Sequence, residues 1–186
     1  MEAEGGQTRR TALKALGTIT NPPAQVVEIL CAALANTDWF VRREAVESLG
    51  RIGNPTPAVI EALLALLVAE EAKAQAHRKR AQQQPPIVED EEDVRAMLAA
   101  LQEGQSLRGD VAMTLAQLGC INDAVIATFL AELSDKEESV RERIVRNWWL
   151  LGKDNPAVLA ALQSALQDAS AMVRKSAAAS LQRLGL

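Results

Sequence analysis

The sequence predicts an all-α protein, a right-handed α-solenoid of about five to six stacked helical hairpins. Composition is the first observation behind this fold class. Hydrophobic residues make up 48% of the 186 residues, aromatic residues make up 3% and tyrosine is absent, which suits Ala- and Leu-rich helices better than β-sheets. The other two observations are a repeat of 33 residues and an apolar spacing typical of helices. Because one hairpin cannot bury its own apolar face, neighbouring hairpins are expected to stack.

One repeated motif predicts the second helix of each hairpin. The stretch from Val41 to Gly53 recurs in pattern from Val140 to Gly152, which is 99 residues, or three repeats, later. Further copies in the same phase span 8–20, 107–119 and 173–185. A glycine closes four of the copies, where helices commonly need a left-handed cap: Gly53, Gly119, Gly152 and Gly185.

A second motif precedes these copies and predicts the first helix of each hairpin. Its apolar residues are spaced by one, three and four positions, which places them on one helical face. The copies begin at Val26, Val59, Val125 and Val158. Pro57 and Pro156 stand just ahead of two of these helices, where a missing N–H costs nothing and φ is already set.

Together the motifs predict a single solenoid over residues 1–186. It consists of a half repeat at 8–20 followed by repeats at 21–53, 54–86, 87–119, 121–153 and 154–186. The half repeat holds only a second helix, which favours a fragment or C-terminal sensor region of a larger protein. An uncapped N-terminal end would expose apolar surface and favour a homodimer.

The repeat at 54–86 departs from the pattern. Polar residues, beginning with Arg78, stand at the core positions of its second helix and cannot form a buried stripe. The helix that starts at Pro57 is therefore expected to continue outward into a polar arm at 70–92. Either the arm is a tolerated insertion, or it binds a partner. Its candidate partner-binding residues are Arg78, Lys79 and Arg80.

An arginine stands near the start of every second-helix motif: Arg9, Arg42, Arg108, Arg141 and Arg174. Six residues before four of them stands an acceptor side chain: Asn36, Gln102, Asp135 and Asp168. A guanidinium at this place can bond such side chains and the unpaired carbonyls of the turn between the helices. We interpret the row as a structural ladder that links repeat to repeat. The alternative is a functional row that reads a ligand.

The clearest candidate for a binding surface is an aromatic pair on one second helix. Trp148 takes a position that holds leucine in other copies and is expected in the core. Trp149 replaces residues that are small or polar elsewhere, so it either contacts a partner or fills space against the next repeat. Aromatic residues beside arginine are enriched in binding hot spots. The candidate partner-binding residues are Arg143, Arg146, Asn147 and Trp149, with Trp39, in the turn before its helix, as a weaker candidate.

The signature Asp…Val-Arg-x-x-Ala-x-x-x-Leu-Gly, which ends at Gly50 in its clearest copy, resembles the HEAT repeat. In particular, it resembles the short HEAT-like repeats of phycobilisome lyases and of many bacterial scaffolding proteins. The resemblance covers nearly the whole chain and is specific for fold rather than activity. It implies an array with a concave surface lined by the second helices and a convex surface on the other side.

We therefore expect a non-enzymatic, cytoplasmic bacterial scaffold that binds another protein through its concave surface or through the arm at 70–92. The sequence offers no phosphate loop, Cys/His cluster or serine elbow, so no catalytic site, metal or cofactor is predicted. A net charge of −4 argues against nucleic acid, and the short apolar runs argue against a membrane span. The resemblance also implies an alternative, a bilin lyase subunit or phycobilisome-maturation factor that binds an open-chain tetrapyrrole.

Overall fold

The computed structural model describes residues 2–83 and 107–186, and over these residues the chain is all-α, an α-solenoid built of helical hairpins. Residues 2–83 form α1 (Glu2–Leu16), α2 (Ala24–Ala33), α3 (Trp39–Ile52) and α4 (Pro57–Gln83). Residues 107–186 form α6 (Arg108–Gln117), α7 (Asp123–Leu133), α8 (Glu138–Arg146), the 3-10 helix η1 (Trp148–Leu151), α9 (Pro156–Ala165) and α10 (Ala171–Arg183). The chain divides into two compact units, Met1–Val111 and Ala112–Leu186.

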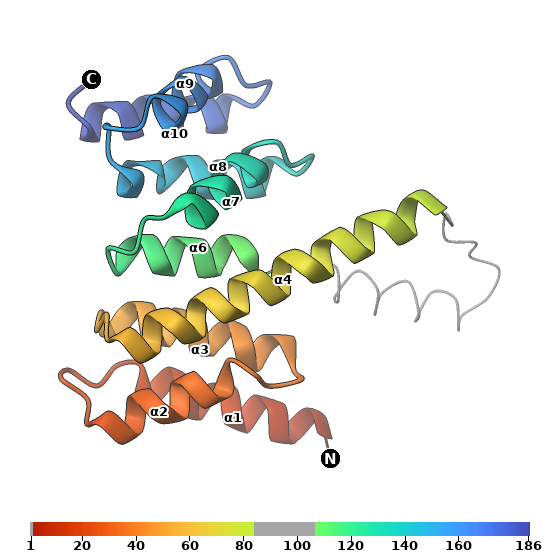
Figure 1. The fold of residues 1–186 in the computed structure, drawn as a ribbon, viewed down its shortest axis with the longest axis vertical. Helices are drawn as coiled ribbons and strands as arrows, with labels where there is room; N and C mark the ends of the chain where they lie inside the picture. Colours follow the sequence, from red (N-terminus) through yellow and green to blue (C-terminus); the bar gives the residue numbers. More distant parts are fainter. Residues whose placement is uncertain (1, 84–106) are drawn as a thin grey trace. The chain divides into compact units, whose positions relative to one another are not determined.

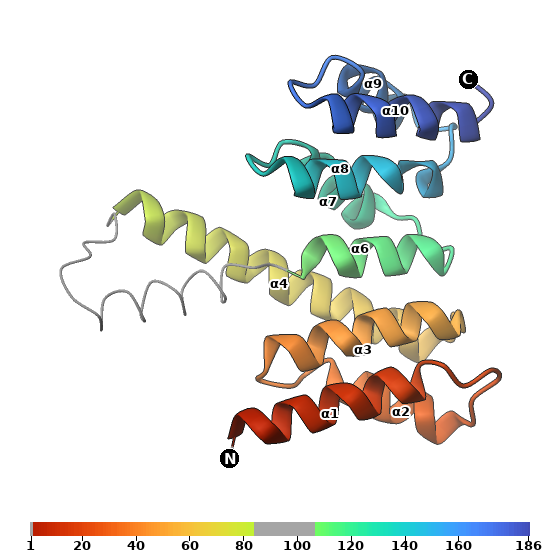
Figure 2. The ribbon, with the colours of Figure 1, turned by 180° about the vertical axis from the view of Figure 1, so that it is seen from behind.

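In the first unit, α3 packs against α1 and α2, and α2 also contacts α4. Figures 1 and 2 show two layers, with α1 beside α3 in one and α2 beside α4 in the other. The residues buried between the layers fall mostly on the predicted apolar positions: Leu13, Val26, Leu30, Leu34, Val41, Ala45, Leu49, Val59, Leu63 and Leu67. The helical spacing of these residues therefore builds the core of this unit.

The second unit repeats this arrangement. Its second helices, α8 and α10, pack on each other, and its first helices, α7 and α9, do the same. Trp148 is fully buried, as predicted, and its ring meets Phe129 edge-on with the centroids 5.8 Å apart. The indole Nε1 of Trp148 donates a hydrogen bond of 3.1 Å to the carbonyl oxygen of Val158, which satisfies its buried polar atom.

The helix ends confirm the sequence signals. The Asn155 side chain caps α9 by accepting from the backbone N–H groups of Ala157 and Val158, and Pro156 occupies the first turn. The four predicted capping glycines all have positive φ, between 67° and 80°. At Gly53 this conformation lets the backbone N–H bond the Leu49 carbonyl and close α3.

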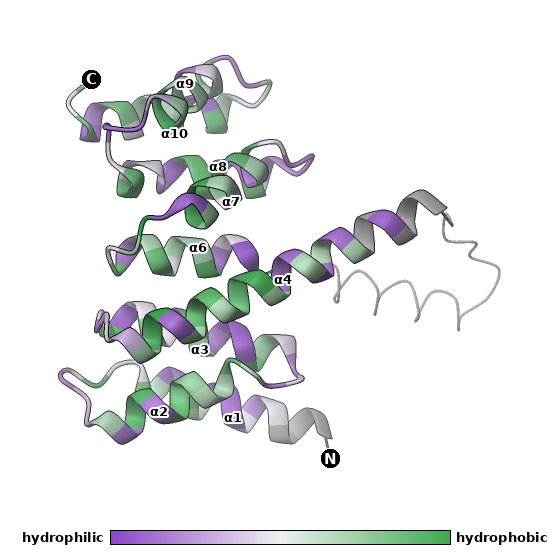
Figure 3. Ribbon diagram, in the orientation of Figure 1, coloured by the Kyte–Doolittle hydropathy of each residue, from purple (hydrophilic) through white to green (hydrophobic). Residues whose placement is uncertain are grey.

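The helix that begins at Pro57 continues without a break for 27 residues. Its first half carries apolar residues and its outer half carries hydrophilic ones (Figure 3). Figure 1 shows the outer half of α4 running past the ends of α1, α2 and α3. The polar residues that follow Glu70 therefore lie, as far as Gln83, on the same helix as the apolar residues before them. The remainder of the expected arm, residues 84–92, lies outside the described part of the chain.

One predicted helix is shorter than expected. The second-helix motif starting at Val140 was expected to stay helical to Leu151, whereas α8 ends at Arg146 and η1 follows. The equivalent position to Trp149, 132 residues or four repeats earlier, is Gly17. A Cβ on Gly17 would lie 2.9 Å from the Ser48 Cα, so the first unit has no room for a side chain at this position. In the second unit the same position holds Trp149, in η1 rather than in an α-helix.

Candidate functional site

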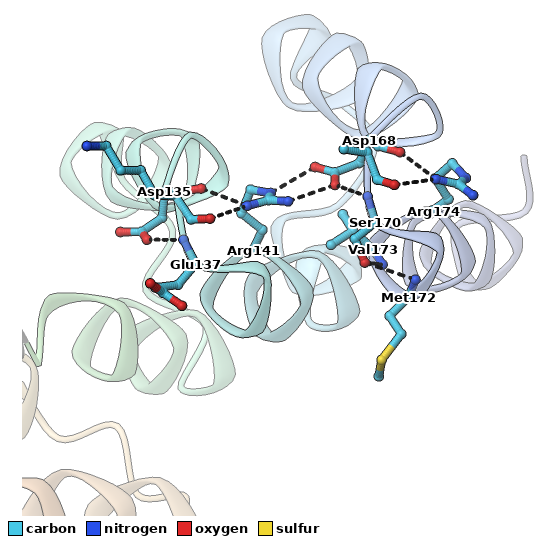
Figure 4. Close-up of polar contacts among 10 residues, drawn as sticks. Asp135, Glu137, Arg141, Asp168, Ser170, Met172, Val173 and Arg174 are labelled. Atoms are coloured by element: carbon cyan, nitrogen blue, oxygen red, sulfur yellow. Dashed lines mark hydrogen bonds and ion pairs between the residues drawn. The ribbon is translucent and has the colours of Figure 1, made fainter.

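Three of the ladder arginines make the same pair of bonds to the turn that precedes their helix. The Nη1 atom of Arg141 donates to the carbonyl oxygens of Asp135 and Lys136, both at 2.9 Å (Figure 4). Arg42 bonds the carbonyls of Asn36 and Thr37 at 3.0 and 2.9 Å, and Arg174 bonds those of Asp168 and Ala169 at 2.7 and 2.9 Å. Each guanidinium thus satisfies two carbonyls of the turn between the two helices of its hairpin.

Arg141 also reaches the next hairpin. Its Nε and Nη2 atoms donate to the two carboxylate oxygens of Asp168, each at 2.9 Å, in the bidentate geometry that suits an Arg–carboxylate pair (Figure 4). Asp168 in turn accepts a bond of 2.8 Å from the backbone N–H of Ser170. The hydrogen bond from Arg141 lowers the pKa of Asp168, and the bond to Asp168 raises the pKa of Arg141.

In the first unit the ladder continues through a residue that the sequence analysis missed. Ala69 stands in the place that Asp168 occupies relative to Arg141, and the neighbouring Glu70 supplies the carboxylate instead. Glu70 is 2% exposed and pairs with Arg42 at 3.4 Å. It also accepts from Lys73 Nζ at 2.9 Å and from the backbone N–H of Leu107 at 3.1 Å. Glu70 therefore ties α4 to α3 and to the residue just before α6.

The two remaining ladder arginines have other described surroundings. Arg108, at the start of α6, pairs with Glu71 at 3.1 Å. Arg9 is exposed on α1. The predicted acceptor Gln102 lies outside the described residues. Glu70 and Glu71, which are adjacent on α4, thus accept hydrogen bonds from Leu107 and Arg108, respectively.

Trp149 lies at the surface of the second unit, 38% exposed, and an arginine covers its ring. That arginine is Arg183, at the end of α10, whose guanidinium carbon is 5.3 Å from the indole centroid. The three predicted neighbours of Trp149 are engaged elsewhere. Arg143 pairs with Glu132 at 3.7 Å, Arg146 pairs with Glu142 at 3.6 Å, and the Asn147 amide donates to the Arg143 carbonyl at 2.8 Å.

A seam between α8 and α10 carries this pair. At one end, the Ser176 hydroxyl donates to Glu142 at 2.9 Å, and in the middle the Ser180 hydroxyl donates to the Val145 carbonyl at 2.6 Å. The contact between Trp149 and Arg183 forms the other end. We call the following seven residues the α8–α10 face: Glu142, Trp149, Ser176, Ser180 and Arg183 of the seam, Arg146, which pairs with Glu142, and the exposed Lys175, which precedes Ser176 on α10.

The other predicted aromatic candidate, Trp39, lies in the first unit. It is the first residue of α3 rather than part of the preceding turn, because the Asp38 side chain caps the helix by accepting from the Phe40 N–H at 2.8 Å. Trp39 is half-buried and meets the Phe40 ring edge-on at 4.9 Å. Arg43 lies 5.5 Å from the Trp39 centroid, and its charge is shared with Glu47 and Asp110.

The predicted basic residues of the arm are only partly described. Lys79 is exposed near the end of α4. The side chains of Arg78 and Arg80 lie outside the described part, although their backbone continues the helix. The structure therefore brings no described partner to this cluster.

Other features of the described residues carry no chemistry of their own. A hollow of about 410 Å³ in the first unit is lined by the two loops 21–22 and 52–55 and by no ionisable side chain. Within residues 2–83 and 107–186, no three His, Cys, Asp or Glu residues gather as a metal site would require. The half-buried Cys31 has a pKa raised by burial, which keeps it a thiol. No helix in the same ranges combines the length and apolarity of a membrane span.

Comparison with known proteins yields one family. The family model for HEAT repeats matches residues 2–83. A search of the curated proteins found no match to the chain.

Several solved structures are similar at low identity. An engineered protein is 21% identical, with a TM-score of 0.40, over 97% of this chain and 91% of that one. Human deoxyhypusine hydroxylase in complex with glycerol is 25% identical, with a TM-score of 0.36, over 97% and 80%. A designed armadillo repeat protein in complex with the peptide (KR)4 is 18% identical, with a TM-score of 0.40, over 96% and 92%. The family match, together with the observed hairpins, shows that residues 2–83 are HEAT repeats.

Proposed function

We propose that this chain is a non-enzymatic scaffold that binds another protein through the α8–α10 face. The observation that carries the proposal is the exposed indole of Trp149 with the Arg183 guanidinium over its ring. Tryptophan and arginine are the residue types most enriched at the energetic centres of protein interfaces. By the resemblance to HEAT repeats, second helices such as α8 and α10 line the concave surface.

The surroundings of Trp149 suit a preformed binding site. Its neighbour Trp148 is fully buried and hydrogen-bonded, which fixes the backbone of η1. The seam bonds from Ser176 and Ser180 fix α10 against α8. A platform that is already ordered loses less conformational entropy when a partner binds.

Two further parts of the proposal concern other regions. The outer half of α4, with Lys79 exposed, would offer a second contact surface for a partner. The ladder arginines would be structural, because their donors are engaged by turn carbonyls and by the carboxylates of neighbouring helices. Bonds of this kind hold repeats in register and leave the α8–α10 face to carry recognition.

The test compares capture of proteins from the native lysate by three versions of the chain. Trp149→Leu removes the aromatic platform while keeping an apolar side chain, since more than half of Trp149 is covered. Ile29→Ser is the matched control, because Ile29 is an exposed apolar residue on α2, in the first-helix layer. Both variants must keep the helical circular dichroism of the wild-type chain.

We expect a protein that the wild-type chain and Ile29→Ser retain and that Trp149→Leu loses. The captured protein could also be a second copy of this chain. Size-exclusion chromatography with light scattering on the purified variants tests this, because a dimer has twice the molar mass of the monomer. Partners retained equally by Trp149→Leu would contradict the proposal that the α8–α10 face binds them.

A further inference from the structure

We propose that the α8–α10 face recognises an acidic protein segment, with Arg183 binding a carboxylate and Trp149 contacting an adjacent apolar side chain. This inference rests on the proposed function, because it names the chemical class of the partner that the same face would bind. Its evidence is the charge state of this face compared with the equivalent face of the first unit.

The first unit supplies an internal reference for Arg183. The equivalent arginine, 132 residues earlier, is Arg51 on α3. Arg51 is neutralised within its own helix, since its Nη2 atom pairs with Glu44 at 2.5 Å and bonds the Ser48 hydroxyl at 2.8 Å. In the second unit Ser176 stands in the place of Glu44. Arg183 has therefore lost the carboxylate that its counterpart uses, and Trp149 has taken the place of Gly17.

Among the described residues, Trp149 is the partner found for Arg183, and this contact leaves the N–H groups of the guanidinium unused. A cation over an aromatic ring is attracted by the electrons of the ring and does not need its N–H donors for that contact. A guanidinium has five such donors, in a fork that matches a carboxylate. Because the contact with the ring already restrains the Arg183 side chain, less rotamer entropy is lost when a carboxylate binds.

The charges around this pair favour the same partner. Lys175, two turns before Arg183 on α10, is exposed and makes no ion pair with any described residue. Arg146 is exposed, with its weak pairing to Glu142 at 3.6 Å. Glu142, the carboxylate of the seam, is already engaged by the Ser176 hydroxyl. The α8–α10 face thus presents three cations against one occupied carboxylate, on a chain whose net charge is −4.

This local excess favours an acidic peptide over a nucleic acid. A nucleic-acid surface draws its affinity from many phosphate contacts, and a chain with an overall negative charge repels a long polyanion. A short segment that carries one or two carboxylates beside an apolar residue matches the size of the face and its mixture of a ring and cations.

The experiment selects peptides from a phage library of random dodecapeptides on the immobilised full chain. Selected peptides are synthesised with a fluorescent label, and their Kd values are measured by anisotropy. Arg183→Gln removes the charge at an exposed position, and Arg51→Gln is the matched control at the equivalent arginine. Trp149→Leu reports whether a peptide binds to the α8–α10 face at all. Labelled oligothymidylate is titrated in parallel as the nucleic-acid probe.

We expect selected peptides to be enriched in Asp and Glu beside apolar residues. Arg183→Gln should raise their Kd about tenfold, as loss of a charge-assisted pair would, while Arg51→Gln leaves it unchanged. Two results would overturn this inference without contradicting the proposed function. In the first, the peptides whose Kd depends on Trp149 are not acidic. In the second, Arg183→Gln leaves the Kd of those peptides unchanged. Oligothymidylate that binds the wild-type chain more tightly than the peptides do, and that loses affinity in Arg183→Gln, would also overturn the inference. If no peptide depends on either residue, the proposed function fails as well.

Discussion

The substitution Gly17→Ala tests the close packing of the end of α1 against α3. A Cβ at position 17 would lie 2.5 Å from the Oγ, 2.6 Å from the Cβ and 2.9 Å from the Cα of Ser48. The hydroxyl can rotate away only by giving up its 3.0 Å bond to the Leu13 carbonyl, a loss of about 1 kcal/mol. The Ser48 backbone can yield only if α3 moves away from α1.

Overpacking of this kind costs about 1–3 kcal/mol, and the lower chain entropy of alanine offsets up to about 1 kcal/mol of it. We therefore expect Gly17→Ala to lower the free energy of unfolding by about 1–2 kcal/mol, measured by urea titration with circular dichroism. Ala15→Gly, at an exposed position on the same helix, calibrates the propensity difference between the two residues. Ser48→Gly in the Gly17→Ala background should recover part of the loss. A Gly17→Ala variant more stable than wild type would refute the close approach.

Two further predictions concern the ladder. Because Arg141 lowers the pKa of folded Asp168, the stability from this pair is present above the unfolded-state pKa of about 3.9 and is lost as the pH falls through the folded-state pKa. Urea titrations across the acid range should accordingly show a shallower pH dependence for Asp168→Asn, and an unchanged slope would contradict the pairing. Glu70→Ala should cost about 3 kcal/mol in the same assay, because it removes the buried carboxylate that the Nη2 atom of Arg42 and the backbone N–H of Leu107 use. A loss below about 0.5 kcal/mol would show that Glu70 is not needed there.

Most of the fold could be predicted because its signals are local. The Asn155 cap and the left-handed glycines such as Gly53 act within a few residues of the chain, and the apolar stripes follow the helical period. The early end of α8, at Arg146, could not be foreseen from these signals, because the apolar pattern of its motif continues to Leu151.

The candidate site was harder to predict because its contacts join different helices. Sequence spacing placed Trp149 on a surface, but it assigned Arg143 and Arg146 as its neighbours, since they are close along the chain. The arginine on the indole is Arg183, from the next hairpin. An offset of 34 residues relates this pair, and Glu142 and Ser176 share it, so the register of two neighbouring second helices was the signal available in the sequence. Glu70 was missed for a similar reason, because it lies one residue beyond the ladder position.

The central claim, that the α8–α10 face binds a protein segment, is tested most directly by the indole signals of the chain labelled with 15N-tryptophan. The chain has three tryptophans, and the buried Trp148 and Trp39, which belongs to the first unit, serve as internal references for Trp149. On titration with a selected acidic peptide, we expect the Trp149 indole signal to shift with saturation while the Trp148 signal stays in place. A titration that saturates with the Trp149 signal unmoved would contradict the claim.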